Sequence, residues 1–589
     1  MGWAAAEAFW KGGWETRLVA GAGGEHGLRL VQRWEAGTCH SRLEHGGTEP
    51  VAVREVVLAS GRIPAAPQTR LYGEGFQMLS QTGGTLASPQ PIGHYTDARH
   101  YRLPEAAGAT TVYGLALLSE AVDSHRLMAF TSCRRFNGAV RFFPSHFEMV
   151  VDTEGLVLFP GEAWELEECY VASGPDQAAL LAELATRLTT HHPRLQWETV
   201  PAGWCSWYWY GPEVGEADIL ANLHVIATRC PELRYIQIDD GYQAALGDWL
   251  EPGPRFPGGL RTLCARIRDA GFEPAIWVAP FIAEPSARLV REHPQWLVQD
   301  ERGQPLPSSE VSFGGWRRGP WYMLDGTHPG AQEYLRHVFG EMRHDWGCRY
   351  FKLDALTWGA LHGGVRHDRR ATRIEAYRRG LAALRRGAGE DSFLLGCNAP
   401  MWASLGEVHG MRVSDDINRT WARITGVARQ CFWRNWQHGR LWLNDPDCLV
   451  LSNKPGRPPL SPDELTFHAT AVLASGGMVL AGDDMTTLGD GAWRWLRRLV
   501  PPLGVAARFD AEGFELGEIE LPGRRLRCRF NWSDAPQPGA VSLPGPCRVT
   551  DFWSGAALGT HAGTFDPGEL APHSARVFEC VPADAPSGG

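Results

Sequence analysis

The chain has 589 residues, of which 44% are hydrophobic and 21% charged, a composition typical of a globular protein long enough for about two to four domains. Its net charge of −10 argues against nucleic acid as a partner, since phosphate binding needs a basic face. The sequence contains no run of about 18 uncharged apolar residues, so we expect no transmembrane helix and no membrane partner.

The start of the chain and its cysteines both indicate a cytoplasmic protein. The first residues, MGWAAAEAFWKGGWE, lack the basic region and the apolar segment of a signal peptide. The 13 cysteines form no CxxC pair and no zinc-binding spacing, and Cys205, Cys348 and Cys397 stand in apolar stretches. We therefore expect reduced thiols in core positions.

The first part of the chain, residues 1–175, predicts β structure. Short alternating segments are separated by Gly, Pro and Asp turns, which favours a large β-sandwich. The clearest segments are Gly27–Arg33, Val51–Leu58, Thr111–Leu118, Leu127–Phe130 and Phe147–Val151. Residues 176–199 then form a linker, in which Asp176–Thr189 has helical spacing and begins with Asp, a good N-cap.

Residues 200–495 alternate between apolar strands and amphipathic helices, the pattern of a catalytic (β/α)₈ TIM barrel. A doubly wound open sheet is the main rival, but no GxGxxG follows the first strand. The expected strands are Gly203–Tyr208, Tyr235–Asp240, Pro274–Pro280, Tyr350–Ala355, Phe393–Asn398, Met411–Asp416, Leu441–Asp447 and Met478–Asp484. The expected helices are Ala217–Thr228, Gly259–Ala270, Ala331–Arg343, Ala371–Arg385 and Asp463–Ser475.

The sequence pattern of β-strands reappears in the last part of the chain and predicts a small C-terminal β-sandwich over residues 500–583. The segments that carry this prediction are Glu515–Leu521, Arg525–Trp532, Arg548–Trp553 and Ala575–Cys580. We expect the final residues, ADAPSGG, to form a loose tail.

Polar residues gather where the predicted barrel strands end, which is where barrel enzymes place their chemistry. Helix N-capping explains one or two of these carboxylates, and Asp483 and Asp484 are candidates for such caps. So many carboxylates together favour a polar, hydroxyl-rich ligand. The residues are Trp207, Asp239, Asp240, Trp277, Lys352, Asp354, Cys397, Arg412, Asp416, Asp445, Asp447, Asp483 and Asp484.

Two of these carboxylates suit glycoside hydrolysis, which needs a nucleophile and an acid/base in different environments. Lys352 shares a strand face with Asp354 and is expected to keep it ionised, as a nucleophile requires. Asp416 is the acid/base candidate, with Asp415 as a neighbour expected to raise its pKa. Arg412, four residues before Asp416, can grip a sugar oxygen.

The chain resembles glycoside hydrolase family 36, the family of microbial α-galactosidases (melibiases), which is related to family 27. The resemblance covers about residues 200–490 and is specific in combination. It is carried by GWCSWYWY (203–210), IQIDDGYQ (236–243), GDWL (247–250), AIWVAPFIAEPSARLVREHPQW (275–296), FKLDAL (351–356), GCNAP (396–400), GMRVSDDI (410–417) and LWLNDPDCLVL (441–451).

The resemblance implies residue roles and a three-domain plan. Asp354 matches the nucleophile and Asp416 the acid/base, with Asp415 as the rival acid. Asp239 and Asp240 match the pair that holds the 4- and 6-hydroxyls, and Lys352, Arg412, Trp277 and Cys397 match other sugar-binding positions. Trp207 and Trp249 are further substrate-binding candidates. In the N-terminal domain, GFQMLS (75–80) replaces a GWQSW-like family segment, so Phe76 stands where the family lends a tryptophan to the barrel mouth.

The resemblance therefore implies a retaining α-galactosidase that acts on melibiose- or raffinose-type oligosaccharides without a metal or an organic cofactor, with a homo-oligomer also compatible. Four alternatives stay open. They are a galactosyltransferase of the raffinose- or stachyose-synthase kind, an α-N-acetylgalactosaminidase, a metal-dependent barrel hydrolase or isomerase, and a non-catalytic sugar-binding protein. The sequence has no HxH motif, and its histidines are dispersed.

Overall fold

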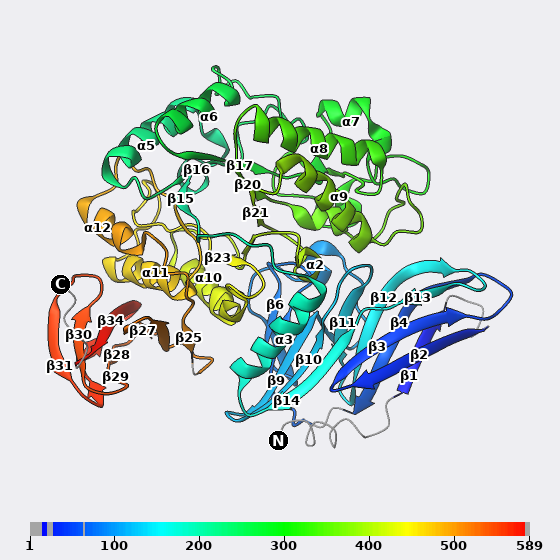
Figure 1. Cartoon of the computed structure of the whole chain (residues 1–589), viewed down its shortest axis with the longest axis horizontal. Coiled ribbons are helices and arrows are strands. Elements are labelled where there is room, and N and C mark those ends of the chain that lie inside the picture. Colours follow the sequence, from blue (N-terminus) through cyan, green and yellow to red (C-terminus); the bar gives the residue numbers. More distant parts are fainter. Residues whose placement is uncertain (1–14, 21–26, 63–64, 510, 584–589) are drawn as a thin grey trace.

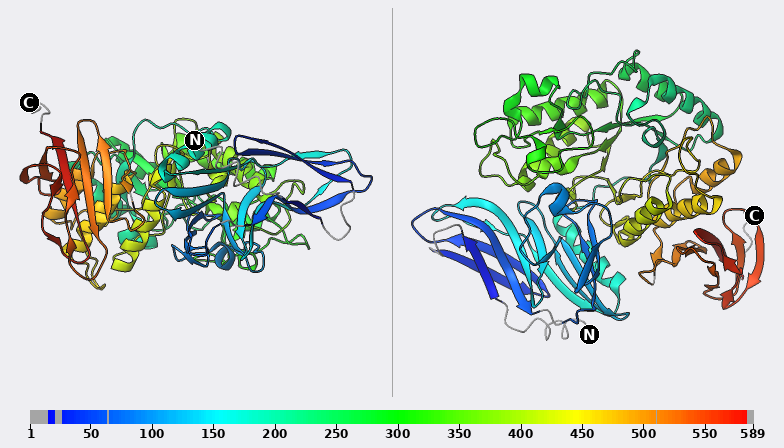
Figure 2. Two further views of the ribbon diagram at one scale, coloured as in Figure 1. Left: turned by 90° about the horizontal axis from the view of Figure 1, so that it is seen from below. Right: turned by 180° about the vertical axis from the view of Figure 1, so that it is seen from behind.

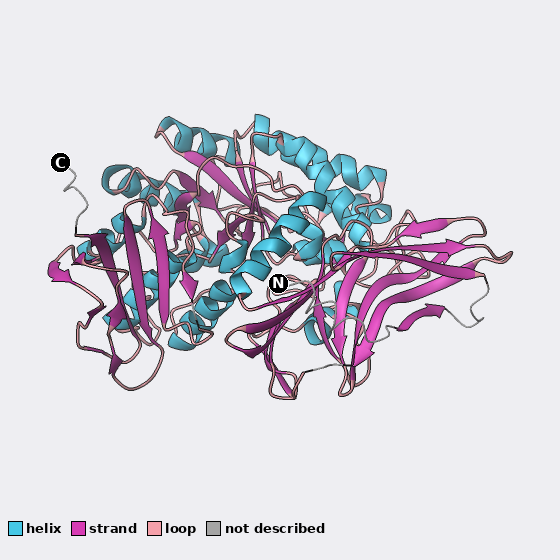
Figure 3. Cartoon of the chain, turned by 60° about the horizontal axis from the view of Figure 1, so that its bottom comes forward, coloured by secondary structure: helices cyan, strands magenta, loops and turns pink. Residues whose placement is uncertain are grey.

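The computed structural model describes residues 15–20, 27–62, 65–509 and 511–583. The helices surround one group of strands in the middle of the chain, and parts built mainly of strands lie to either side of it (Figures 1 and 3). The expected fold class is confirmed: a (β/α)₈ barrel is flanked by an N-terminal and a C-terminal set of antiparallel sheets. The first residues of the chain and most of the ADAPSGG tail fall outside the described residues.

The N-terminal part consists of two antiparallel sheets, with the short helix α2 (Asp97–Tyr101) in a connection. The five-stranded sheet has the order β1 (Glu15–Ala20), β4 (Val51–Arg62), β12 (His146–Leu158), β11 (Asn137–Phe142), β8 (Thr110–Tyr113). The nine-stranded sheet has the order β13 (Ala163–Glu165), β3 (Thr38–His45), β14 (Cys169–Gly174), β10 (Ser124–Phe130), β9 (Leu115–Ala121), β5 (Arg70–Glu74), β6 (Gln81–Thr85), β7 (Ser88–Pro91), and β2 (Leu28–Glu35) pairs with β3.

One strand prediction in this part is wrong. Thr111–Leu118 is not a single strand but divides at Gly114 into β8 and β9, which belong to different sheets. Gly114 has φ +71°, which favours glycine, and a Cβ at this position would lie 2.3 Å from the Trp402 ring. The chain therefore crosses between the sheets where a barrel side chain packs against its backbone.

The predicted linker helix is confirmed as α3 (Gln177–His191). The Asp176 side chain caps it by accepting hydrogen bonds from the Ala178 N–H at 2.8 Å and the Ala179 N–H at 3.2 Å. Its buried face carries Leu180, Leu181, Leu184, Ala185 and Leu188.

The barrel sheet contains eight parallel strands that pair in chain order, and the first of them, β15, also pairs with the last, β24. Between β23 and β24 the Met478 N–H donates to the Asn444 carbonyl at 2.9 Å, so the sheet is nearly closed. A Cβ at Gly477 would lie 2.1 Å from that carbonyl oxygen, so glycine permits this close approach. The strands are β15 (Ala202–Cys205), β16 (Tyr235–Ile238), β17 (Glu273–Val278), β20 (Tyr350–Leu353), β21 (Phe393–Gly396), β22 (Gly410–Arg412), β23 (Leu443–Asp445) and β24 (Val479–Ala481).

All eight predicted barrel strands are present, but each ends two to four residues earlier than expected. Most of the carboxylates, Asp239, Asp354 and Asp416 among them, therefore follow the strands, whereas Lys352, Arg412 and Asp445 lie within them. Asp239, Asp354 and Asp415 each accept a hydrogen bond from the amide of the next residue. Such local bonds compete with the strand ladder and end it.

The helices around the barrel include the five that the sequence predicts and two that it missed, α10 and α12. The predicted helices are α5 (Glu216–Arg229), α6 (Leu260–Asp269), α8 (Pro329–His344), α9 (Arg373–Ala388) and α11 (Pro462–Ser475); the other two are α10 (Trp421–Trp433) and α12 (Asp490–Leu499). Shorter elements are α4 (Trp207–Tyr210), α7 (Arg288–Glu292), η1 (Gly211–Glu213), η2 (Pro294–Trp296), η3 (Ser308–Glu310), η4 (Leu356–Ala360), η5 (Trp402–Ser404), η6 (Asn435–Gln437), and the paired strands β18 (Ile282–Ala283) and β19 (Tyr322–Met323).

The C-terminal part is antiparallel and begins beside α10 and α11 (Figure 2). Its six-stranded sheet has the order β25 (Arg508–Phe509), β26 (Leu516–Leu521), β27 (Arg524–Asn531), β34 (Ser574–Pro582), β30 (Cys547–Asp551), β31 (Ala557–His561). Two further pairs are β28 (Gln537–Pro538) with β33 (Glu569–Leu570), and β29 (Val541–Ser542) with β32 (Thr564–Phe565). The four predicted strand segments correspond to β26, β27, β30 and β34. The boundaries that we draw between domains stay a prediction.

All 13 cysteines are buried and free, as the sequence predicts. Within the described residues, no helix is both long enough and apolar enough to cross a bilayer.

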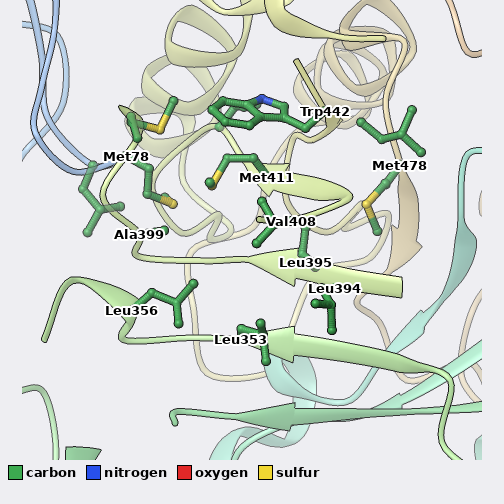
Figure 4. Packing of buried hydrophobic residues seen from close by; sticks show 14 of the residues in the cluster. Met78, Leu353, Leu356, Leu394, Leu395, Ala399, Val408, Met411, Trp442 and Met478 are labelled. Carbon is green, nitrogen blue, oxygen red and sulfur yellow. The ribbon is translucent and has the colours of Figure 1, made fainter. Parts of the chain in front are cut away.

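The N-terminal sheets are joined to the barrel by a buried ion pair and a short backbone ladder. Arg434 and Glu74 are fully buried, with Nη2 and Oε2 2.7 Å apart. Nearby, the Met78 N–H donates to the Ala399 carbonyl at 2.9 Å, and the Met401 N–H donates to the Phe76 carbonyl at 2.8 Å. Met78 thus packs among barrel residues, as Figure 4 shows. The segment around Met78 is thereby fixed against the loop that follows β21.

We predict that Glu74→Gln lowers the free energy of unfolding by about 3–5 kcal/mol, because it leaves the Arg434 guanidinium buried without a counter-charge. Urea unfolding followed by tryptophan fluorescence measures this change. The matched control is Glu390→Gln, which removes the carboxylate of an exposed pair with Arg385, 82% exposed on the glutamate side. Its unfolding midpoint should stay at that of the wild type. Equal effects of the two substitutions would contradict the importance of the buried pair.

Candidate active site

The carboxyl ends of the barrel strands surround a pocket of about 200 Å³. It collects side chains from several strand ends and from the N-terminal part of the chain. The lining residues are Met78, Leu79, Tyr95, Trp207, Asp239, Asp240, Trp277, Trp316, Lys352, Asp354, Cys397, Asn398, Asp415 and Asp416. Of the sequence-predicted site residues, the structure therefore brings together Trp207, Asp239, Asp240, Trp277, Lys352, Asp354, Cys397 and Asp416.

Lys352 forms its ion pair with Asp239, not with Asp354. Its Nζ lies 3.0 Å from Asp239 Oδ2, and the two side chains are 7% and 2% exposed. Burial acts to lower the pKa of Lys352, but the Asp239 carboxylate outweighs it and holds the pKa well above its usual value. Lys352 is therefore a fixed positive charge, and Gln237 Nε2, 2.6 Å from the same oxygen, completes the pairing of Asp239.

Asp354 lies directly after β20 and is held at both carboxylate oxygens. The Trp277 indole N–H donates to Oδ2 at 3.0 Å, and the Ala355 N–H donates to Oδ1 at 2.6 Å. Burial raises the pKa of Asp354 above its usual value, while the Lys352 charge and the Trp277 hydrogen bond act in the opposite direction. The expected effect of Lys352 is thus present but is outweighed by burial.

Asp416 is the open member of the site, with a side chain 61% exposed. The buried Arg412 donates from Nη2 to Asp416 Oδ1 at 2.6 Å. The protein that encloses the pocket acts to raise the pKa of Asp416, but Arg412 and Lys352 outweigh it, so the pKa lies below its usual value. The expected upward shift of the Asp416 pKa is therefore not found. Asp415 is itself buried and paired with Arg423, and its Oδ1 accepts the Asp416 N–H at 2.7 Å.

Asp240 forms an ion pair with Arg317, a residue that the sequence did not predict for this site. Arg317 donates through Nε to Asp240 Oδ2 at 2.6 Å and through Nη2 to Oδ1, and Gln243 Nε2 donates to Oδ1 at 2.7 Å. The neighbouring Trp316 lines the pocket and is 40% exposed. Both residues stand in the long connection between β17 and α8, where GGWRRGPW carries no motif that points to the pocket. Only the structure shows that this connection folds over Asp240.

Three predicted binding residues do not line the pocket. Phe76 is buried, with its ring 5.9 Å from that of Tyr113. The neighbouring Met78 and Leu79, together with Tyr95, line the pocket instead, so the aromatic ring that the N-terminal part contributes is that of Tyr95. Trp249 is buried, with its ring 5.8 Å from that of Trp277.

The third, Arg412, is 1% exposed and acts through its contact with Asp416. The interpretation of Asp483 and Asp484 as helix caps is also wrong, since α12 begins after Gly489. Asp483 pairs with Arg419 at 2.7 Å, and Asp484 accepts the Thr486 N–H at 3.0 Å in a local turn. No three His, Cys, Asp or Glu side chains are grouped to hold a metal ion in the part of the chain that the structure describes.

Residues 236–379 match the Melibiase family model. Among curated proteins, an Escherichia coli α-galactosidase is 29% identical over 124 residues, which are 20% of this chain and 16% of that protein. The chain thus covers about a fifth or less of the length of the first curated relatives that it matches. The segment that matches the family model, residues 236–379, includes Asp239, Asp240, Trp277, Lys352 and Asp354.

Solved structures match over much more of the chain. An α-galactosidase from Thermus thermophilus in complex with p-nitrophenyl α-D-galactopyranoside is 25% identical with a TM-score of 0.63, and the match covers 85% of this chain and 98% of that one. An α-galactosidase from Lactobacillus brevis has a TM-score of 0.68 at 13% identity, covering 98% of this chain and 86% of that one. The second match shows a shared fold alone.

We predict that Trp277→Phe moves the pKa of Asp354 further upward, because it removes a hydrogen bond that stabilises the ionised carboxylate. Carbon-13 NMR of protein labelled at the aspartate carboxyl carbons measures the titration midpoint, and the signal lost in Asp354→Asn identifies the residue. Trp249→Phe is the control, since it removes the neighbouring indole N–H without touching Asp354. An unchanged midpoint in Trp277→Phe would show that the indole does not govern this carboxylate.

Proposed function

We propose that the protein is a retaining α-galactosidase of glycoside hydrolase family 36 that releases terminal α-linked galactose from melibiose- and raffinose-type oligosaccharides. The observation that carries this proposal is the pair Asp354 and Asp416 in one pocket with unlike surroundings, the first buried among fixed donors and the second open to solvent. The Melibiase match and the solved α-galactosidases support the choice of sugar.

In the proposed reaction, Asp354 attacks the anomeric carbon while Asp416 donates a proton to the departing glycosidic oxygen. The carbon–oxygen bond to the leaving group breaks as a galactosyl ester forms on Asp354. Asp416, now a carboxylate, removes a proton from water, and that water cleaves the ester to give α-galactose. Both carboxylates return to their starting states, so the cycle balances without a cofactor.

Substrate binding can raise the pKa of Asp416, so that this residue takes up the proton that it needs to act as an acid. Its side chain is 61% exposed to solvent in the open pocket. A leaving group placed against Asp416 would displace solvent from the carboxylate and so raise its pKa. The charge of Asp416 raises the pKa of Asp354, so protonation of Asp416 favours ionised Asp354. The two carboxylates therefore reach their working states together.

We assign the galactose hydroxyls to the charged wall formed by Asp239, Asp240 and Lys352, with the axial 4-hydroxyl and the 6-hydroxyl held by the two aspartates. Arg317 and Lys352 fix these carboxylates in place, so little reorganisation is needed when the sugar binds. Trp316, Tyr95 and Leu79 surround the opening where the rest of an oligosaccharide would leave the pocket.

The buried free thiols are typical of proteins in a reducing compartment, and we propose a cytoplasmic location. A galactosyltransferase would use the same two carboxylates with a sugar hydroxyl in place of water. Analysis of products formed from raffinose, with and without added acceptor sugar, separates hydrolysis from transfer.

We predict that Asp354→Ala lowers kcat for p-nitrophenyl α-galactoside by several orders of magnitude, because the covalent step is lost. Added azide should restore turnover and yield β-galactosyl azide, since direct attack inverts the anomeric centre. Asp416→Ala with azide should give the α-anomer, because azide then intercepts the ester. Proton NMR of the products reads the configuration.

The control for these variants is Asp484→Asn, which changes a carboxylate at a neighbouring strand end outside the pocket and should keep the wild-type rate. A wild type without α-galactosidase activity would refute the proposal. The same azide anomer from both variants would show that the two roles are wrongly divided.

A further inference from the structure

Asp447 has no role in the reaction as described so far, yet its surroundings are unusual. It follows β23, is 3% exposed, and has φ +76°, a left-handed conformation that is rare for residues other than glycine. A non-glycine residue persists in such a conformation only where its surroundings fix it, and such positions cluster at functional sites. The Asp447 N–H donates to Asp445 Oδ1 at 2.9 Å, which holds this turn closed.

One carboxylate oxygen of Asp447 collects three partners. Arg412 Nη2 lies 2.9 Å from Oδ2, the Ile417 N–H donates to the same oxygen at 2.7 Å, and the Tyr208 hydroxyl donates to it as well. Ile417 is the residue directly after Asp416. Asp447 therefore holds both the backbone beside the proposed acid/base and the arginine that contacts it.

Arg412 is shared between the two carboxylates through one nitrogen. Nη2 donates to Asp416 Oδ1 at 2.6 Å and lies 2.9 Å from Asp447 Oδ2, and the guanidinium is 1% exposed. A buried cation between two carboxylates divides its attraction between them. The charge on Asp447 thus decides how strongly Arg412 holds Asp416 in its ionised form.

We propose that Asp447 is a positioning residue that sets the proton affinity of Asp416, by neutralising Arg412 and by holding the Ile417 amide. The proposal rests on the proposed function, in which Asp416 is the acid/base. The charged and titratable groups that face Asp416 from all sides are Arg412, Lys352, Arg423, Asp354, Asp415, Asp447, Cys397, Tyr95 and Tyr208.

Within this set, Asp447 can change its charge near neutral pH. Burial raises its pKa to about 6, although Arg412 acts to lower it. Above this pH the Asp447 carboxylate neutralises Arg412 and lets Asp416 keep its proton more readily. Below this pH, Asp447 is protonated and neutral, so it no longer competes with Asp416 for the charge of Arg412. The undivided attraction of Arg412 then favours loss of the Asp416 proton. The link makes the acid/base depend on a residue outside the pocket.

The test is the pH profile of kcat/KM for p-nitrophenyl α-galactoside in Asp447→Asn. The amide oxygen can still accept from Ile417 and Tyr208, but the charge is gone. The basic limb, which reports loss of the Asp416 proton, should move to lower pH by about one pH unit. A basic limb that stays in place or moves to higher pH would overturn the proposal.

Two controls separate charge from packing. Tyr208→Phe removes a hydrogen bond to the same Asp447 oxygen without removing charge, and its basic limb should stay at the wild-type position. Asp483→Asn removes a buried carboxylate at a neighbouring strand end, but one paired with Arg419 instead of Arg412, and should also leave the limb in place. A shift of equal size in Asp483→Asn would assign the effect to general loss of charge and refute a specific role for Asp447.

A second measurement needs neither activity nor a variant at Asp447. In the full-length wild type with carbon-13 labelled aspartate carboxyls, the signal lost in Asp416→Asn should show, besides its own titration, a second step near the Asp447 pKa of about 6. A single step would overturn the coupling. If the wild type hydrolyses no α-galactoside, the proposed function fails, while this titration still decides the link between Asp447 and Asp416.

Discussion

A lysine ammonium and an aspartate carboxylate, buried together at the ends of two barrel strands, constrain the rest of the site. Each ion alone in this position would cost several kcal/mol, so Lys352 and Asp239 must stay paired. The same rule holds around the pocket, where Arg317 pairs with Asp240, Arg423 with Asp415, and Arg412 with Asp447. The charged side chains are therefore fixed before any ligand arrives, which is the preorganisation that electrostatic catalysis requires. Asp416, with most of its side chain in solvent, is the member of this network placed to exchange a proton with water.

The pocket is completed by a part of the chain far away in sequence. The buried pair of Glu74 and Arg434, and the backbone bonds between Phe76–Met78 and Ala399–Met401, hold the N-terminal sheets against the loop after β21 and against the junction between α10 and η6. Arg434 also donates to the Val413 carbonyl, so the joint between the two parts contacts the segment after β22 that leads to the proposed acid/base. The barrel supplies the first sugar subsite in this account. The N-terminal part supplies Met78, Leu79 and Tyr95 to the pocket lining.

Much of the fold could be predicted because apolar strands and amphipathic helices leave clear periodic patterns. The eight barrel strands and the carboxylates that follow them are of this kind. What the sequence could not show is which charges meet. Lys352 and Asp354 share a strand face, yet the lysine reaches across to Asp239. Arg317 is remote from Asp240 in sequence and lies in a loop without a motif, and Phe76 turns inward while Leu79 and Tyr95 face the pocket. These outcomes depend on side-chain direction across long loops, which periodicity does not encode.

The proposed reaction depends on a covalent bond between Asp354 and the sugar, and peptide mapping by mass spectrometry can detect this bond. The Asp416→Ala variant, given p-nitrophenyl α-galactoside, should form the ester with a leaving group that needs little protonation but hydrolyse it slowly, since no base activates water. After rapid acid quenching and digestion, we expect one galactosyl residue attached to Asp354 on the peptide that contains FKLDAL. A galactosyl residue on a different carboxylate, or no adduct while p-nitrophenol is released in a burst, would contradict it.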